Sequence, residues 1–248
     1  MSETEALTAD WPAPARVRTL ITTRRGGVSP APFASLNLGD HVGDTPENVA
    51  ANRALVRQRL PAEPAWLVQT HSILTVAAET VRAPTEADAS FTRQADTVCV
   101  VMTADCLPVL LCDRQGTVVG AAHAGWRGLC NGVIETLAQA MATPGEQLMA
   151  WLGPAIGPDA FEVGAEVRAA FMAIDPRAAQ AFTEIDRDKY LADIYLLARQ
   201  RLNRLGVEEI HGGDRCTVIE RGQFFSYRRD GRTGRMGSMI WLADDSAM

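Results

Sequence analysis

Two histidines and one cysteine, His71, Cys106 and His123, occupy positions where their side chains could bind a metal ion together. Each follows an apolar run that we expect to be a strand, namely residues 66–70, 98–102 and 118–122. Strand ends are where α/β proteins commonly place functional groups. Zinc takes cysteine sulfur and histidine nitrogen as ligands, and a site with three protein ligands keeps a fourth position open for catalysis.

The sequence alone leaves other interpretations of these residues open. The three ligands do not form a compact ligand motif, and a lone histidine or cysteine is most often structural. Alternatively, Cys106 and His123 form a nucleophile and its base, as in cysteine hydrolases. His71 has no task in such a pair, whereas a metal site uses all three side chains. A binding module without catalysis is a third alternative.

Length and composition narrow the class of protein. The chain has 248 residues, of which 47% are hydrophobic and 22% charged, as expected for one globular domain. A net charge of −6 argues against a general nucleic-acid binder. We find no apolar run long enough for a membrane helix and no secretory signal at the N-terminus. Five cysteines, an odd number, indicate reduced thiols, so we expect a cytoplasmic protein.

Helices and strands alternate along the chain, which predicts an α/β layered domain spanning residues 1–248. Residues 1–15, which contain prolines, are expected to be loosely ordered. The strands at 109–112 and 118–122 should pair antiparallel across a short turn, so the sheet should be mixed. We expect helices at 46–60, 166–174 and 189–205, and a helix that opens at 125–128 and carries an apolar stripe to residue 141. Further strands are expected at 17–22, 149–152, 216–219 and 239–242.

Two motifs resemble the signature of a known family. They are Thr103-Ala104-Asp105-Cys106-Leu107-Pro108-Val109 and Ala122-His123-Ala124-Gly125-Trp126-Arg127-Gly128. The chain is similar here to the laccase-domain family, also called the multicopper polyphenol oxidase or YfiH family. The likeness continues, in order, at residues 35–39, 69–71, 153–157 and 225–230, and so covers nearly the whole chain. One departure is Ser72, where the family often has glycine, and it affects only the local turn.

The resemblance implies a single three-layer α/β/α domain with a metal site of two histidines and a cysteine, matching His71, Cys106 and His123. It implies a purine nucleoside phosphorylase acting on adenosine, inosine and methylthioadenosine, with adenosine deaminase as a side activity, so the partners would be a small nucleoside and phosphate. The alternative it implies is an amidase that edits a cytoplasmic peptidoglycan precursor, beside the Cys/His hydrolase above.

The older laccase label fits the residues least well. A multicopper cluster needs many imidazole ligands, and the chain has four histidines in total. The Cys/His₂ set suits zinc better, although copper can occupy the same ligands in vitro because it binds more tightly than zinc.

Five further residues are candidates for the site. Arg127 lies in the turn that opens a helix and could hold phosphate. Asp105 could act as general acid or base, or could orient a histidine ligand. Asn37 and Gln69 could hydrogen-bond a base or ribose, and Arg53 could face the site from its helix. For each of these residues a structural role is the alternative.

Overall fold

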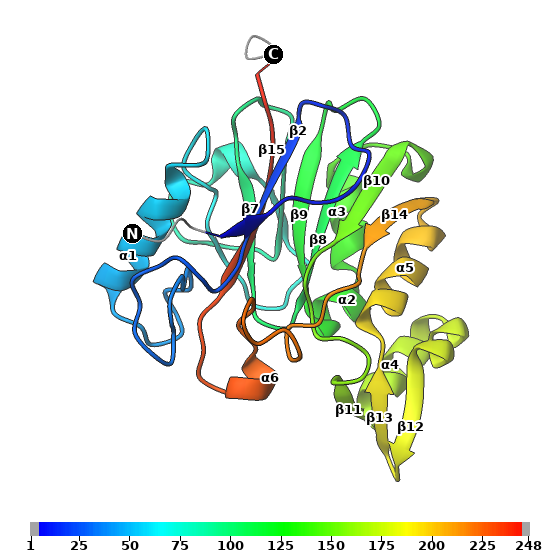
Figure 1. Cartoon of the computed structure of the whole chain (residues 1–248). Helices are drawn as coiled ribbons and strands as arrows, with labels where there is room; N and C mark the ends of the chain where they lie inside the picture. The colour runs from blue at the N-terminus through cyan, green and yellow to red at the C-terminus, as the bar shows by residue number, and fades with distance from the viewer. Residues whose placement is uncertain (1–4, 245–248) are drawn as a thin grey trace.

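The computed structural model describes residues 5–244, in which two β-sheets lie face to face and helices cover both outer surfaces (Figure 1). The smaller sheet has the order β1 (Ala6–Leu7), β2 (Val17–Thr22), β15 (Met236–Leu242), β7 (Cys99–Thr103). The larger has the order β14 (Glu209–Gly212), β10 (Leu148–Leu152), β8 (Leu107–Asp113), β9 (Val119–Ala124), β6 (Ala89–Thr92), β4 (Thr75–Ala77).

Helices close the two outer faces. Helix α1 (Pro46–Arg57) covers the smaller sheet, and α2 (Trp126–Asn131), α3 (Val133–Ala140) and α5 (Ile194–Arg204) cover the larger one. The remaining α-helices are α4 (Ala165–Ile174) and α6 (Tyr227–Asp230). The remaining strands form a three-stranded sheet of β11 (Glu162–Gly164), β13 (Lys189–Ala192) and β12 (Phe182–Asp186), and the pair β3 (Leu67–Val68) and β5 (Thr85–Glu86). Short 3-10 helices lie at Ala78–Thr80, Gly145–Gln147 and Pro176–Ala181. No helix within residues 5–244 has the length and apolar character needed to cross a membrane.

Alternation along the strands builds the layers, because successive side chains of a strand point to opposite faces. In β7, Val101 packs between the two sheets whereas Val100 packs toward α1. In β8, Leu110 packs between the sheets whereas Val109 and Leu111 pack toward the helices. These strands are therefore buried on both faces, as their continuous apolar sequences predict.

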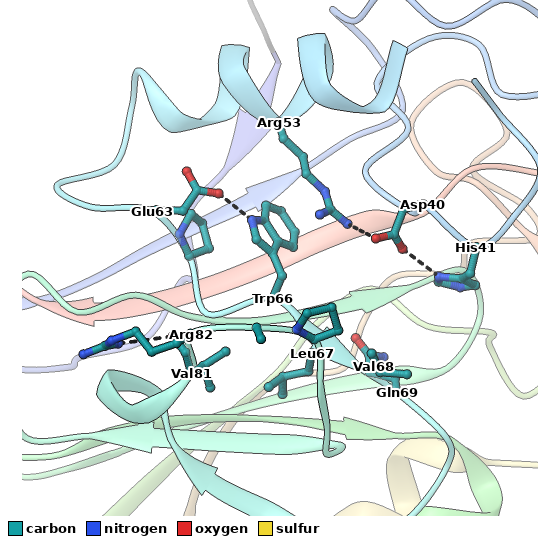
Figure 2. A pocket seen from close by; sticks show the side chains of 13 residues that line it. Asp40, His41, Arg53, Glu63, Trp66, Leu67, Val68, Gln69, Val81 and Arg82 are labelled. Atoms are coloured by element: carbon teal, nitrogen blue, oxygen red, sulfur yellow. Dashed lines mark hydrogen bonds and ion pairs between the residues drawn. The ribbon is translucent and has the colours of Figure 1, made fainter. Parts of the chain in front are cut away.

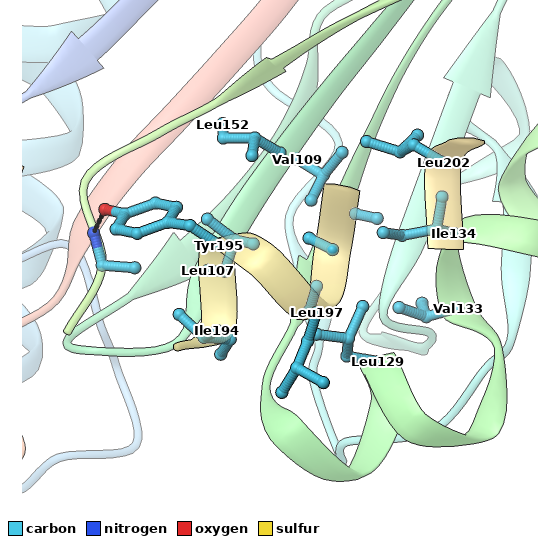
Figure 3. Packing of buried hydrophobic residues seen from close by; sticks show 14 of the residues in the cluster. Leu107, Val109, Leu129, Val133, Ile134, Leu152, Ile194, Tyr195, Leu197 and Leu202 are labelled. Atoms are coloured by element: carbon cyan, nitrogen blue, oxygen red, sulfur yellow. Dashed lines mark hydrogen bonds between the residues drawn. The ribbon is translucent and has the colours of Figure 1, made fainter. Parts of the chain in front are cut away.

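The core between the larger sheet and its helices is the most extensive (Figure 3). Leu107 and Val109 of β8 contact leucine and isoleucine side chains of α2, α3 and α5 there. Tyr195 of α5 lies at the edge of this core, and its hydroxyl accepts a hydrogen bond of 2.8 Å from the Ala155 amide. The helices thereby fix the ends of β8 and β9, which carry the candidate site.

The α/β class, the mixed sheet and the antiparallel pairing of β8 with β9 are confirmed. The β layer between the helices consists of two stacked sheets, and the larger of them is mixed. Order along the sequence does not reveal this division, because β15, near the C-terminus, pairs with both β2 and β7.

Four local expectations need correction or refinement. Residues 189–205 are not one helix: β13 ends at Ala192, and the Asp193 side chain caps α5 by accepting from the Leu196 amide. Residues 216–219 form turns with a single bridge to Ala155, not a strand.

The helix after Gly125 is interrupted at Gly132, whose φ of 106° suits glycine. Residues 1–4 lie outside the described residues, whereas residues 6–7 pair with β2.

Candidate metal centre

His71, Cys106 and His123 converge at one end of the space between the two sheets. His123 is a buried residue within β9, Cys106 lies in the turn joining β7 to β8, and His71 follows β3 with a φ of 61°. One ligand atom from each lies within 4.8 Å of the others, and Cys106 Sγ is 3.7 Å from His71 Nε2. The structure therefore brings together the three residues that the sequence predicted as ligands, with His123 inside its strand rather than after it.

The donor set and its spacing fit a tetrahedral zinc ion. Zinc lies about 2.3 Å from sulfur and about 2.05 Å from nitrogen, which at a tetrahedral angle places the two donors about 3.6 Å apart. The observed 3.7 Å between Cys106 Sγ and His71 Nε2 matches that separation. Three ligands of this kind leave one coordination position for a substrate or water.

A buried carboxylate, Asp88, orients both histidines. One oxygen accepts hydrogen bonds from His123 Nδ1 at 2.8 Å and from the His71 amide at 3.0 Å. The other accepts from the amides of Thr70 and Ser72 and from the Ser72 hydroxyl at 2.8 Å. A carboxylate on Nδ1 fixes the tautomer in which Nε2 is free to bind a metal. Asp88 therefore fixes the ring orientation of His123 and the backbone position of His71.

Sequence reasoning missed Asp88, because the mixed polar sequence around it does not indicate a buried carboxylate. Asp88 lies just before β6, between Ala87 and Ala89, and the structure buries all three residues fully. Aspartate is almost never fully buried unless it has a partner. The sequence did not reveal the partner, because His123 lies 35 residues further along the chain.

Cys106 and His123 each shift the pKa of the other. Burial of the thiol raises the pKa of Cys106, but the neighbouring His123 and His71 outweigh it and bring the pKa down to about 6. Burial lowers the pKa of His123, yet Cys106 and Asp88 raise it to about 9. The Asp88 pKa falls to about 2, because hydrogen bonds from His123 and Ser72 outweigh its burial. At neutral pH the metal-free pair is therefore a thiolate beside an imidazolium.

These pKa values predict how zinc affinity depends on pH. Between pH 6 and 9 the thiolate is already formed, but His123 must lose its proton to bind a metal. The affinity constant should therefore rise about tenfold per pH unit in this range, with about one proton released from His123 per ion bound. Zinc titration calorimetry in buffers of different ionisation enthalpy measures both quantities. An affinity that stays flat from pH 6 to 9 would contradict this protonation pattern.

Gly125 leaves room for the ligands. A Cβ atom at this position would lie 2.7 Å from His71 Cδ2 and 3.0 Å from Cys106 Sγ. The Gly125 backbone, with a φ of −60°, is open to any residue, so only the missing side chain matters here.

Gly125→Ala is therefore expected to displace two ligands without removing a donor, and to weaken zinc binding roughly tenfold or more. Zinc competition with a chromophoric chelator measures the change. Gly222→Ala is the control, because its Cβ would meet only the end of the flexible Arg25 side chain. Equal zinc affinities for Gly125→Ala and the wild type would show that the ligands do not occupy this space.

The three candidate ligands line a cavity of about 370 Å³ that shares lining residues with two others. Its wall also contains His41, Gln69, Met102, Thr103, Ala104, Tyr227 and Arg235. A larger cavity of about 550 Å³ shares His41 and Gln69 with it and lies between α1 and β3 (Figure 2). A smaller one of about 130 Å³ shares Cys106 and Tyr227 and is walled by aromatic side chains such as Trp126 and Phe161.

Asn37 and Gln69 use their amide groups within the protein. Gln69 Nε2 donates to the Met102 carbonyl at 2.8 Å, and its Oε1 accepts from the Met102 amide at 2.7 Å. The Asn37 side chain is fully buried; it donates to Gly39 O and accepts from the amides of Gly39 and Arg235. Gln69 lines the central cavity, whereas Asn37 supports its wall from behind.

The other predicted residues lie around the cavities. Both Asp105 carboxylate oxygens are engaged, one by the Thr217 hydroxyl and one by the Arg228 amide, each at 2.6 Å. Arg53 lines the larger cavity, stacks 4.1 Å from the centre of the Trp66 ring, and pairs with Asp40 (Figure 2). Arg127 is exposed, stacks on its neighbour Trp126, and lines none of these three cavities.

Known proteins resemble this chain over nearly its whole length. Residues 18–243 match the family model described as multi-copper polyphenol oxidoreductase laccase. A purine nucleoside phosphorylase of Pseudomonas aeruginosa is 54% identical over 239 residues, covering 96% of this chain and 98% of the relative. A purine nucleoside phosphorylase of Escherichia coli is 57% identical over 236 residues, covering 94% and 96% of the two chains.

Solved structures share the fold. A crystal structure of a Neisseria meningitidis protein superposes with a TM-score of 0.94 at 57% identity, covering 96% of this chain and 99% of that one. The YlmD protein of Geobacillus stearothermophilus gives a TM-score of 0.89 at 29% identity, covering 98% of both chains. The two-sheet architecture is therefore common to these proteins.

Proposed function

The chain belongs to the multi-copper polyphenol oxidoreductase laccase family, and we propose that it is a zinc-dependent purine nucleoside phosphorylase. The observation that carries the proposal is the His71, Cys106 and His123 group lining a cavity of ligand size. The names of relatives at 54% and 57% identity support the phosphorylase activity. The proposed substrates are phosphate with adenosine, inosine or methylthioadenosine, and slower deamination of adenosine is the side activity.

The proposed reaction transfers a pentose from a base to phosphate. A phosphate oxygen bonds to C1′ as the bond from C1′ to the purine nitrogen breaks, and the base leaves with the electron pair and gains a proton. In the deamination, water adds at C6 of adenosine and ammonia leaves. When bound, zinc would supply a positive charge that orients an oxyanion or lowers the pKa of a water. Both substrates are intracellular metabolites, so the proposal places the enzyme in the cytoplasm.

The chain's own residues would hold and orient the reacting groups. His71, Cys106 and His123 would hold the ion, and Asp88 would keep Nε2 of His123 free for it. Asp105 enters this proposal as a positioning residue rather than a general acid, since both its oxygens are engaged in fixing the loops beside Cys106.

The laccase label of the family is not part of the proposal. A multicopper oxidase needs many imidazole ligands, whereas the described residues place two histidines and one cysteine at this site. Copper could still occupy the ligands in vitro, because copper outcompetes zinc for such donors.

A second candidate function is supported by the larger adjoining cavity. Its volume of about 550 Å³ beside the metal centre offers room for a substrate larger than a nucleoside, such as a seryl muramic acid precursor. The chain would then be an amidase that edits a peptidoglycan precursor.

One side-by-side assay separates the two functions. Adenosine, inosine, methylthioadenosine and the seryl muramic precursor are each incubated with the zinc-loaded protein, with and without phosphate. We expect ribose-1-phosphate from inosine and adenosine only when phosphate is present. Turnover of the precursor alone would replace the phosphorylase with the amidase.

A further inference from the structure

Arg235 projects into the central cavity from the residue just before β15, and its position is fixed by several contacts. Its amide donates to Asn37 Oδ1 at 2.9 Å, and its Nη1 donates to the carbonyls of Thr233 and Gly234 at 3.2 and 3.1 Å. Its stem packs on Gly39, where a Cβ atom would come within 2.7 Å of Arg235 Cγ. The guanidinium is therefore held in place before any ligand arrives.

This cation has no anionic partner among residues 5–244. No carboxylate of these residues lies within 4.0 Å of an Arg235 nitrogen, and the ion pairs of the cavity region involve other cations. Its Nε and Nη2 donate no hydrogen bond to a described residue, which leaves one side of the guanidinium open for two parallel bonds. A partly buried charge without a counterion is costly, so the site favours an anion.

The side chains that line this cavity include no carboxylate. Cys106, which is among them, is one of the proposed metal ligands. Burial lowers the pKa of His41 on the same wall, and the nearby Arg235 charge lowers it further. Asp105 attracts the Arg235 charge from outside this lining, but both Asp105 oxygens already accept hydrogen bonds from Thr217 and Arg228.

The other arginines near the site are less suited to this task. Arg53 already pairs with Asp40 and donates to the Leu38 carbonyl. Arg127, the sequence-based candidate for phosphate, is exposed and stacks on Trp126 outside the cavity.

We propose that Arg235 binds an oxyanion through Nε and Nη2 in the cavity beside Cys106. This proposal rests on the proposed function, in which the oxyanion is the inorganic phosphate that attacks the nucleoside. In the amidase alternative the same guanidinium would bind a phosphate or carboxylate of the larger precursor. The shared chemistry is a tetrahedral or planar oxyanion placed next to the metal.

The test compares Arg235→Met and Arg235→Lys with the wild type, all loaded with zinc. Loss of a charged, bidentate hydrogen bond is expected to weaken binding of inorganic phosphate, measured by calorimetry, about 10- to 100-fold in Arg235→Met. Arg235→Lys keeps the positive charge but cannot form two parallel hydrogen bonds, so its phosphate affinity should lie between those of the wild type and Arg235→Met. In phosphorolysis the KM for phosphate should rise by a similar factor, and the KM for inosine should change by much less.

Arg187→Met is the matched control, because it removes the same charge from a side chain that is 95% exposed on the β12–β13 hairpin. Zinc content near one ion per chain verifies that each variant is folded and loaded. If Arg235→Met does not fold, Arg235→Lys alone decides the question through its phosphate affinity.

The outcomes separate this assignment from the proposed function. Wild-type phosphate affinity in Arg235→Met, or its loss in Arg127→Met instead, overturns the assignment. Binding of phosphate that depends on Arg235 without any phosphorolysis supports the site but refutes the phosphorylase. An increased KM for the muramic precursor in Arg235→Met, with phosphate acting only as a competitor, identifies the precursor as the source of the oxyanion. A wild type that binds neither phosphate nor the precursor refutes the oxyanion site.

Discussion

Cys106→Ala is expected to lose its zinc and to lower phosphorolysis by about a thousandfold or more. A bound metal supplies several kcal/mol of transition-state stabilisation, and each 1.36 kcal/mol corresponds to a factor of ten in rate. Elemental analysis and an inosine assay measure the two losses. Cys216→Ala is the matched control, because Cys216 is the other partly exposed cysteine and does not belong to the ligand group.

Cys106→Asp extends the same experiment to mechanism. Aspartate keeps an anionic ligand, so part of the zinc and part of the activity should survive. If Cys106 is instead a nucleophile paired with His123, Cys106→Asp should be inactive even where zinc remains bound. A variant that retains zinc and has no activity would therefore favour the cysteine hydrolase.

Asp88→Asn is expected to weaken zinc binding about 10- to 100-fold, the usual effect of losing a residue that orients a metal ligand. The amide has one acceptor oxygen in place of two, so it cannot satisfy both His123 Nδ1 and the amides of the 70–72 loop. If its NH₂ group faces His123, the ring carries its proton on Nε2 and cannot bind the metal through that nitrogen. Competition titration with a chelator measures the affinity, and nitrogen chemical shifts of His123 report the tautomer.

Asp113→Asn is the control for Asp88→Asn. Asp113 is also a buried carboxylate and accepts hydrogen bonds from the Thr117 amide, the Thr117 hydroxyl and the Val118 amide in the turn between β8 and β9. Both variants should lose stability, by about 1–3 kcal/mol. Only Asp88→Asn should change the zinc affinity and the His123 tautomer. Equal effects of the two variants on zinc would reduce Asp88 to a structural residue.

That the three candidate ligands belong to one site was predictable, whereas the residues around them were not. His71, Cys106 and His123 were found because their residue types suit zinc and because the motifs around them resemble a family with such a site. Asp88 and Arg235 act through partners far away in sequence, and a single sequence does not show which distant residues meet. The same limit explains why the helix expected at 189–205 begins only at Ile194, since residues 189–192 pair with β11 and β12.

Roles of polar residues were harder to predict than their positions. Gln69 was a candidate for nucleoside contact and does line the cavity. Its side-chain amide, however, is hydrogen-bonded to the backbone carbonyl and amide of Met102. Arg127, in a helix-opening turn, was a candidate for phosphate binding or for a structural role, and its side chain lies over Trp126. A motif fixes the backbone path, but the direction of a long side chain depends on packing that a single sequence does not reveal.

Alkylation of Cys106, followed by mass spectrometry with and without a chelator, tests the metal centre most directly. We expect freshly purified protein to carry about one zinc ion per chain. Cys106 should then resist mild alkylation, because the thiolate lone pair that would attack the reagent is bound to zinc. Chelation should expose Cys106, abolish activity, and be reversed by added zinc. A covalent substrate adduct on Cys106 in metal-free, fully active protein would contradict the zinc enzyme described here.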